Sequence, residues 1–317
     1  MSDLSVALGP LRLDYPLINA SGTLELLDLA ETVGRPFIEE PPVAAYVTKT
    51  VTLSPRSGNP PPRILQVPMG MLNAVGLPSK GVEAFVADEL PRLLCLPCPL
   101  ILSIGGFATD EYVSLARRLK EALESGLGAD WAGRIGLELN ISCPNVHSGC
   151  AAIGSDATQT EELVSAVRES WSGLLVAKLT PDVSDIVMIA RAAEKAGADA
   201  VAAVNTFRGL ALDRHSLKPY LGNLTGGLSG PAIKPLALRC VYELFAGVDI
   251  PIIGMGGVAN IQDVLEFMAC GANVVAIGSS GLREQCLASI LADKLRASLA
   301  QRGLPMDELV GCAHQAR

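Results

Sequence analysis

The sequence has few of the side chains on which several common kinds of active site depend. Among its 317 residues there are only three histidines, His147, His215 and His314, and aromatic residues make up 4%. A histidine-based metal centre or a Ser-His-Asp triad is therefore poorly supported, since both need histidine beside other functional groups. The chain also carries no Rossmann dinucleotide-binding fingerprint and no four-cysteine cluster motif, so any NAD or iron–sulfur chemistry would lie in another chain.

Basic clusters and long apolar runs are also absent. The formal net charge is -8 and no basic patch stands out, which argues against nucleic acid as a partner. No stretch reaches the roughly 18 apolar residues of a membrane span. The N-terminal segment contains acidic residues and no long apolar run, so it resembles neither a secretory signal nor a transit peptide. We therefore expect a soluble, cytoplasmic protein with no metal site.

Eight cysteines are scattered along the chain, and most are expected to be reduced, buried thiols. Cys95 and Cys98 form a C-x-x-C pair, but no second pair and no histidine lies near them. Structural metal sites in proteins usually need four ligands, so a metal or redox role is disfavoured for this pair.

The chain is rich in short apolar runs, and hydrophobic residues make up 49% of it. Eight of these runs read as strands: residues 16–22, 44–51, 100–106, 135–142, 174–180, 200–206, 251–257 and 273–280. Amphipathic stretches lie between most of them, for example residues 110–125, 159–169, 183–196 and 233–245. This alternation predicts parallel strands with crossover helices, and eight units favour a closed (β/α)8 TIM barrel. A doubly wound open sheet is the alternative.

No low-complexity linker divides the sequence, so we predict one barrel domain over residues 1–317, beginning with an N-terminal hairpin. Two segments interrupt the alternation. Residues 53–64 are rich in proline and glycine, and residues 213–230 form a second long insertion. Both are expected at the C-terminal side of the barrel, where barrel enzymes keep their sites, and long loops there are often lids.

The predicted strands end in polar or small residues that a barrel would bring to one mouth. Along the chain these are Asn19, Ser21, Lys49, Thr50, Ser103, Asn140, Cys143, Lys178, Asn205, Thr206, Gly256, Gly257, Gly278 and Ser279. Buried lysines and amides need partners, which here would be a polar ligand. Glycine-rich turns after the last two strands suit a phosphate group, although tight turns alone would also explain them.

Cys143 lies between Asn140 and Asn145, where a strand gives way to a loop. A partly exposed thiol in polar surroundings can serve as nucleophile or general base, whereas most cysteines are buried and inert. Amides such as Asn73, Asn140 and Asn205 carry both donors and acceptors, which suits a pyrimidine or flavin ring edge.

Taken together, the motifs resemble those of the class 1 dihydroorotate dehydrogenase family over nearly the whole chain. They recur in the family's order and spacing: INASGT, VTKTVTLSPRSGNPPPRI, GMLNAVGLPSKGVEAF, LNISCPNV, KLTP, VNT, GGLSGPAIKP, IIGMGG and AIGSS. Class 2 members resemble the chain less, since they carry serine at the base position and an N-terminal extension. The resemblance implies a TIM-barrel flavoprotein that uses FMN to oxidise (S)-dihydroorotate to orotate in pyrimidine biosynthesis.

The resemblance also implies roles for individual residues. Cys143 would be the base that takes a proton from C5, while a hydride passes from C6 to FMN. Substrate contacts would come from Lys49, Asn73, Ala74, Val75, Gly76, Leu77, Asn140, Asn145, Asn205 and Thr206. FMN contacts would come from Ser21, Lys49, Thr50, Ser103, Asn140, Lys178, Val204, Gly230, Gly256, Gly257, Gly278 and Ser279. Lys178 would stabilise the charge of the reduced flavin.

Within class 1, the sequences of these motifs are closer to those of the B subtype. That resemblance implies two catalytic subunits with two electron-transfer subunits, which carry FAD and a 2Fe-2S cluster and pass electrons to NAD+. Alternatives are an A-subtype homodimer that uses fumarate, a flavin oxidoreductase for another dihydropyrimidine, or a non-enzymatic phosphate-binding barrel.

Three features depart from the family pattern. Ser103 stands where many relatives have an asparagine. His147 and Cys150 change the sequence of the lid. Residues 20–28, ASGTLELLD, lack the aromatic residues that are usual after this motif.

Overall fold

The computed structural model describes residues 3–34, 36–142 and 153–315, and its centre is a barrel of eight parallel strands. In chain order the barrel strands are β3 (Leu17–Asn19), β4 (Tyr46–Val47), β7 (Leu100–Ile104), β8 (Ile135–Asn140), β9 (Leu175–Lys178), β10 (Ala200–Ala203), β13 (Ile252–Met255) and β14 (Val274–Ile277). Their order around the sheet is β3-β14-β13-β10-β9-β8-β7-β4. All eight predicted strands are confirmed, each shorter than expected, and the predicted barrel is confirmed rather than an open sheet.

A side chain completes the seam between the first and last strands of this order. The Asn19 amide nitrogen donates to the Val47 carbonyl at 2.8 Å, and its amide oxygen accepts from the Val47 nitrogen at 2.9 Å. One backbone bond, from the Ala44 nitrogen to the Leu17 carbonyl at 3.0 Å, lies beside them. The amide of Asn19 thus takes the place of a strand residue and satisfies backbone groups that would otherwise be buried without partners.

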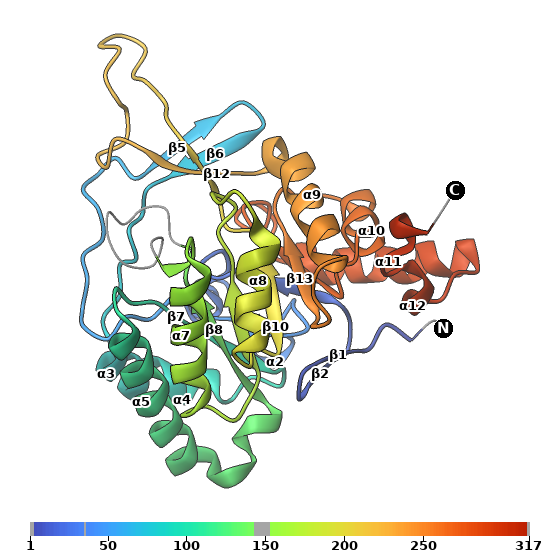
Figure 1. The fold of residues 1–317 in the computed structure, drawn as a ribbon, viewed down its shortest axis with the longest axis horizontal. Coiled ribbons are helices and arrows are strands. Elements are labelled where there is room, and N and C mark those ends of the chain that lie inside the picture. The colour runs from blue at the N-terminus through green and yellow to red at the C-terminus, as the bar shows by residue number, and fades with distance from the viewer. Residues whose placement is uncertain (1–2, 35, 143–152, 316–317) are drawn as a thin grey trace.

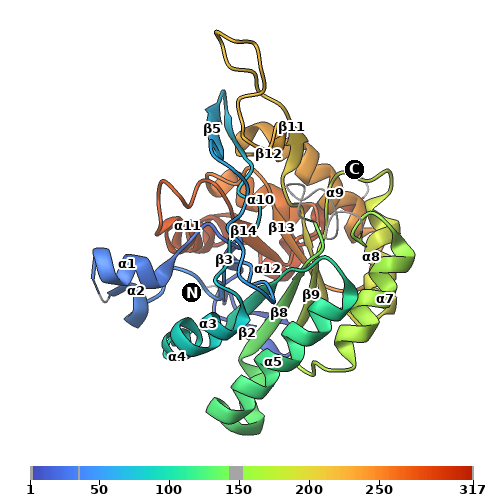
Figure 2. The same ribbon diagram turned by 90° about the vertical axis from the view of Figure 1, so that its left-hand side faces the viewer.

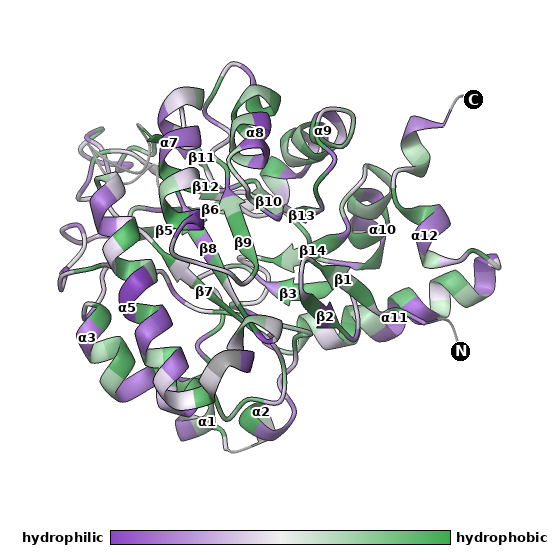
Figure 3. Cartoon of the chain, turned by 60° about the horizontal axis from the view of Figure 1, so that its bottom comes forward, coloured by the Kyte–Doolittle hydropathy of each residue, from purple (hydrophilic) through white to green (hydrophobic). Residues whose placement is uncertain are grey.

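Helices surround the barrel and pack side by side (Figures 1 and 2). The long ones are α5 (Thr109–Leu127), α7 (Ala157–Arg168), α8 (Ile186–Lys195), α9 (Lys234–Phe245), α10 (Ile261–Ala269) and α11 (Leu287–Arg302). Each presents an apolar side to the strands, as Figure 3 shows by colour. The four helices predicted at residues 110–125, 159–169, 183–196 and 233–245 are confirmed.

Short helical segments fill the connections. They are α1 (Leu26–Thr32), α2 (Pro36–Glu39), α3 (Val82–Ala84), η1 (Phe85–Glu89), α4 (Leu90–Leu93), η2 (Gly128–Gly133), η3 (Pro231–Ile233), α12 (Met306–Leu309) and η4 (Cys312–His314). Within the described ranges, no helix is long and apolar enough to cross a membrane.

The predicted N-terminal hairpin is confirmed and closes one end of the barrel. Strands β1 (Val6–Leu8) and β2 (Leu11–Leu13) pair antiparallel. Their buried leucines Leu8, Leu11 and Leu13 pack in one cluster with interior barrel residues such as Leu174 and Val274. Because the N-terminal end is filled by apolar side chains, a ligand site is confined to the other end.

A second, antiparallel sheet stands above the open end. It has the order β11-β12-β6-β5 and is formed by β11 (Phe207–Gly209), β12 (Gly226–Ser229), β6 (Gly70–Asn73) and β5 (Ile64–Val67). Figure 1 shows β5, β6 and β12 projecting beyond the barrel. Strand β12 lies within the predicted insertion at residues 213–230, and β5 begins at the last residue of the predicted insertion at residues 53–64. The two insertions were predicted at this side of the barrel, but the pairing of the chain around them was not.

Candidate functional site

The C-terminal ends of the barrel strands open into a pocket of about 300 Å³. This volume lies at the lower end of the range for small-molecule sites, roughly 300–1,000 Å³. Both the barrel ends and the mouth sheet contribute walls. The described lining residues are Ala20, Ser21, Gly22, Thr23, Lys49, Thr50, Ile64, Met71, Asn73, Val75, Gly76, Leu77, Pro78, Asn140, Lys178, Val204, Asn205, Thr206, Ser229, Gly230, Ile233, Met255, Gly256, Gly257, Gly278, Ser279 and Leu282.

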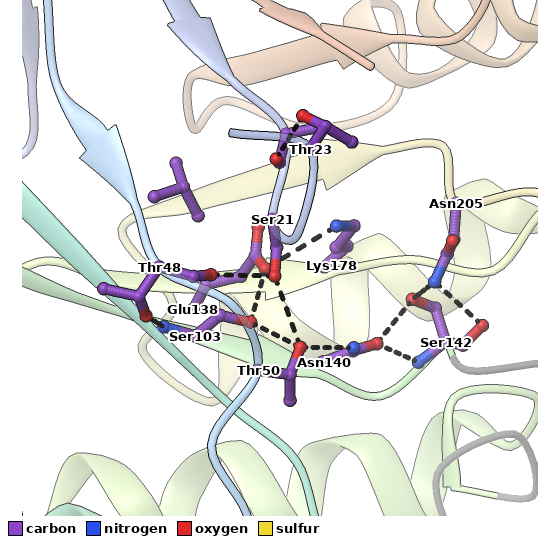
Figure 4. A network of polar contacts seen from close by, with 12 residues as sticks. Ser21, Thr23, Thr48, Thr50, Ser103, Glu138, Asn140, Ser142, Lys178 and Asn205 are labelled. Atoms are coloured by element: carbon purple, nitrogen blue, oxygen red, sulfur yellow. Dashed lines mark hydrogen bonds and ion pairs between the residues drawn. The ribbon is translucent and has the colours of Figure 1, made fainter. Parts of the chain in front are cut away.

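A continuous network of polar side chains forms part of the floor (Figure 4). Thr50 is its centre, because its hydroxyl lies 3.3 Å from the Ser21 hydroxyl and 3.0 Å from the Ser103 hydroxyl. The same Thr50 oxygen accepts from the Asn140 amide nitrogen at 3.0 Å. Strands β7 and β8 and the segments after β3 and β4 are thereby tied together at the mouth, and the side chains of Ser21, Thr50 and Asn140 are held in place.

The network continues toward the segment after β10. Ser142 donates its hydroxyl to the Asn140 amide oxygen at 3.1 Å and accepts from the Asn205 amide nitrogen at 2.9 Å. Asn205 in turn accepts from the Thr206 backbone nitrogen at 2.8 Å. Asn140 and Asn205 are therefore oriented by neighbours before any ligand binds, which lowers the entropy lost on binding.

A buried ion pair lies beneath this network. Lys178 and Glu138 are 5% and 3% exposed, and the Lys178 Nζ lies 3.6 Å from Glu138 Oε1. Glu138 also accepts from the Ser103 hydroxyl at 2.8 Å. Lys178 lines the pocket, and Glu138 does not. The site therefore contains a cation that is almost fully withdrawn from water and is matched by a single carboxylate.

A second lysine lies at the pocket's rim, where it is half exposed. The Lys49 Nζ is 3.4 Å from Glu25 Oε1, and the two side chains are 50% and 43% exposed. Burial raises the pKa of Glu25, and the Lys49 charge only partly offsets this effect. The rim thus holds the Lys49 ammonium, which an entering anion can reach. The Glu25 carboxylate would compete with that anion for the ammonium.

Glycines that follow β12, β13 and β14 shape another part of the pocket wall. Gly256 and Gly257 have φ values of +128° and +83°, which other residues rarely adopt. A Cβ at Gly256 would lie 2.7 Å from the Ala237 Cβ, and one at Gly257 would lie 2.9 Å from the Gly230 carbonyl oxygen. Only glycine fits these positions, and the result is a smooth backbone cradle of the kind that holds phosphate groups.

Comparison with known proteins identifies the family. The family model for dihydroorotate dehydrogenase matches residues 4–299.

The chain belongs to the dihydroorotate dehydrogenase family.

Several relatives are named "Dihydroorotate dehydrogenase B (NAD(+)), catalytic subunit". The relative from Desulforudis audaxviator is 44% identical over 312 residues, which cover 98% of this chain and 97% of that protein. The one from Trichlorobacter lovleyi is 40% identical over 97% of both chains. The one from Bacteroides thetaiotaomicron is 39% identical over 98% of this chain and 99% of that protein.

A solved structure gives the same fold. The dihydroorotate dehydrogenase from Eimeria tenella, crystallised with ferulenol, superposes with a TM-score of 0.75 at 22% identity. The match covers 99% of this chain and 89% of that one. At this identity the likeness bears on the fold alone, and it agrees with the TIM barrel described above.

Dihydroorotate dehydrogenases use FMN, and the residues of this pocket fit that cofactor. The glycine cradle would take the phosphate, because a Cβ at Gly256, Gly257 or Gly230 would collide with neighbouring atoms. The buried Lys178 would lie against the electron-rich edge of the ring.

Most of the residues predicted to contact ligand line this pocket, but two described ones do not. Ser103 is fully buried behind Thr50, and Ala74 is buried in the mouth sheet with its neighbours Leu72 and Leu221. Cys143, Asn145, His147 and Cys150 lie outside the described residues.

Glu138 is not among the predicted site residues, because residues 135–142 were predicted as one apolar strand. The alternation of side chains along that strand could have revealed Glu138 as a residue facing the site. Residues two apart on a strand share a face, so Glu138 had to point the same way as Asn140.

The C-x-x-C pair makes no site among the described residues. Cys95 is exposed and its thiol donates to the Pro91 carbonyl at 3.5 Å. Burial raises the pKa of the Cys98 thiol to about 11, which disfavours the reactive thiolate. No group of three or more metal-ligating side chains occurs in the ranges that the structure describes.

Proposed function

We propose that the protein is an FMN-dependent oxidoreductase that converts (S)-dihydroorotate to orotate in de novo pyrimidine biosynthesis. Membership of the dihydroorotate dehydrogenase family supports this reaction. The observation that carries it is the buried Lys178, which lines one pocket together with oriented amides and a glycine cradle. We further propose that residues 1–317 act as one FMN-binding domain in the cytoplasm.

In this proposal the lining residues of the pocket would hold the cofactor. Its phosphate would be held by Gly230, Gly256, Gly257, Gly278 and Ser279, and its ring system by Ser21, Thr50, Lys178 and Val204. Bound FMN supplies the acceptor for a hydride from C6 of the substrate. Lys178 holds a positive charge at the ring edge, where it favours an electron-rich ring.

The substrate binds between this floor and the mouth sheet. Ser142 orients both Asn140 and Asn205, and Thr206 follows Asn205 on the segment after β10. Asn73 extends from β6 above, while the Lys49 ammonium at the rim suits the substrate carboxylate. The segment Val75–Leu77 completes this side of the pocket.

Cys143 is proposed as the general base. The support is its position in the motif LNISCPNV, three residues after the last residue of β8, whose side chain lines the pocket. A thiolate at this mouth would remove the proton from C5 while the hydride leaves C6, so the substrate loses one proton and one hydride. Asn145, two residues further on, is proposed as an additional substrate amide.

Electrons are proposed to leave through a second kind of subunit. Relatives about 40% identical carry the name of a B-type, NAD(+)-linked catalytic subunit, which supports this type for the present chain. The proposed partner carries FAD and a 2Fe-2S cluster and passes electrons to NAD+. The proposed assembly is a homodimer of this chain, joined by two partner subunits into a heterotetramer.

Anaerobic reduction tests the reaction. The protein reconstituted with FMN should be yellow, and dihydroorotate should bleach it with release of orotate. Dihydrouracil is the matched control, since it has the same ring without the carboxylate and should bleach the flavin far more slowly. Equal rates with both compounds would point to a general dihydropyrimidine oxidoreductase. A protein that stays colourless with FMN would refute the proposal.

The acceptor is tested separately. The chain alone should reduce an artificial dye but not NAD+, and addition of a B-type electron-transfer subunit should confer reduction of NAD+. Rapid turnover of the bare chain with fumarate would instead assign it to the A type.

A further inference from the structure

Glu138 is a buried carboxylate for which the proposed reaction supplies no role. We propose that it is a positioning residue that holds the Lys178 ammonium against the pocket and offsets its charge, and thereby lowers the reduction potential of the bound flavin. This inference rests on the proposed function, because it concerns the cofactor of the same site.

Strand register fixes the relation between the two residues. Glu138 and Asn140 are two apart on β8, so both side chains point into the barrel, with Glu138 one layer deeper. On the neighbouring strand, Lys178 is paired in register with Asn140. The ammonium can therefore reach the pocket floor beside Asn140, while the carboxylate lies below it and outside the pocket wall.

Glu138 is itself held by the other neighbouring strand. Ser103 on β7 is in register with Glu138, and its hydroxyl donates to Glu138 Oε1 at 2.8 Å. The same oxygen lies 3.6 Å from the Lys178 Nζ. The carboxylate thus links a fixed hydroxyl to the mobile end of a long lysine side chain, and it restricts the positions that the ammonium can occupy.

The charge of Glu138 matters as much as its position. Both side chains are almost completely withdrawn from water, where charges interact much more strongly than at the surface. A reduced flavin gains negative charge near Lys178, and Glu138 both repels that charge and shares the cation. The pair therefore leaves the pocket floor close to neutral before the ring is reduced, which disfavours the reduced form.

Neutral substitution separates this role from a structural one. Glu138→Gln keeps an oxygen that can accept from Ser103 but removes the charge. Ser103→Ala keeps both charges and removes the hydrogen bond. Asp199→Asn is the distant control, since Asp199 pairs with Arg168 at 2.9 Å just before β10 begins, at the end of the barrel opposite the pocket. The measurement is the midpoint potential of bound FMN, by equilibration with a reference dye.

For Glu138→Gln we expect the ratio of reduced to oxidised flavin at a fixed potential to rise about tenfold, which is about 30 mV for two electrons. Ser103→Ala should change the ratio less than about threefold, and Asp199→Asn should leave it unchanged. Should Glu138→Gln fail to fold, Glu138→Asp takes its place. That variant keeps the charge but withdraws it by one methylene group, and a smaller shift of the same sign is expected.

The inference would be overturned if the Glu138 variant that folds leaves the midpoint potential of bound FMN unchanged. This holds even if that variant is less stable than the parent. A shift of equal size in Asp199→Asn would also overturn it, since the effect would then be nonspecific. Failure of the parent protein to bind FMN would refute the proposed function instead, so the two failures are distinguishable.

Discussion

Replacement of Asn19 by leucine should weaken the barrel at its seam. Asn19 is 3% exposed, and its side chain makes two hydrogen bonds to Val47 across the gap between β3 and β4, besides one to the Ala20 carbonyl. Leucine has a similar size and fits an apolar interior, but it can neither donate nor accept a hydrogen bond. Asn19→Leu would therefore leave the Val47 nitrogen and carbonyl without their partner while the packing volume stays nearly constant.

The expected loss follows from those two backbone groups. Each buried, unsatisfied backbone group costs about 1–3 kcal/mol, so two would cost about 4 kcal/mol. Burial of the apolar leucine side chain returns part of this, roughly 1–2 kcal/mol. We expect the free energy of unfolding to fall by about 2–3 kcal/mol, a large fraction of the 5–15 kcal/mol typical of folded proteins.

Urea denaturation of the apoprotein measures this change without the added stability of bound cofactor. Asn223→Leu is the matched control, because Asn223 lies in the insertion and makes only a 3.4 Å bond to the nearby Thr225 carbonyl. Its effect should stay within about 0.5 kcal/mol. If Asn19→Leu is no more destabilising than this control, the seam does not depend on the asparagine and the reasoning is wrong.

Three further predictions concern the pocket. Burial raises the pKa of Glu25, so the native state holds this proton more tightly than the unfolded chain does. As pH rises through the titration of Glu25, the free energy of unfolding of the parent should therefore fall relative to that of Glu25→Gln. Denaturation over a pH series measures this difference. A rise in the parent's relative stability would mean that the Lys49 charge outweighs burial. Gly257→Ala should weaken FMN binding at least about tenfold, as measured by fluorescence quenching, because the added Cβ would meet the Gly230 carbonyl. Gly303 is the control: it also has a positive φ but faces open space, so Gly303→Ala should leave FMN binding unchanged. Cys143→Ala should slow flavin reduction by dihydroorotate about 100-fold or more in stopped-flow traces while orotate binding persists, and a parental rate would exclude the thiol as base.

The barrel could be predicted from the sequence because its strands are buried on both faces. Such strands appear as continuous apolar runs, as at residues 174–180 and 251–257. Their ends could not be predicted, because backbone bonds such as that from the Asn205 nitrogen to the Leu179 carbonyl continue toward the mouth after the regular strand has ended. The predicted strand at 200–206, for example, ends at Ala203, and Asn205 and Thr206 lie beyond it.

The mouth sheet could not be predicted for a different reason. Residues Gly226–Ser229 include two glycines and have little intrinsic tendency to form a strand. They do so because β6, more than 150 residues earlier, lies alongside and supplies hydrogen-bond partners. Pairing over such a separation is a property of the folded chain and leaves no local pattern.

The site was predicted where a residue's own chemistry is conspicuous and missed where it depends on neighbours. Lys178 stood out as a lysine in an apolar run, and the structure finds it lining the pocket. Ser103 was assigned to the cofactor, yet it lies behind Thr50 and bonds to Glu138. Neither the depth of Ser103 nor its partner could be inferred without the register between β7 and β8.

The central claim is that one pocket at the barrel mouth holds both FMN and the pyrimidine. A crystal structure of the protein with FMN and orotate tests it most directly. The phosphate should lie against Gly256, Gly257 and Gly278, with orotate between the flavin ring and the amides of Asn140 and Asn205. Density for either molecule outside this pocket, or a phosphate bound beside Lys49 and away from these glycines, would contradict the account.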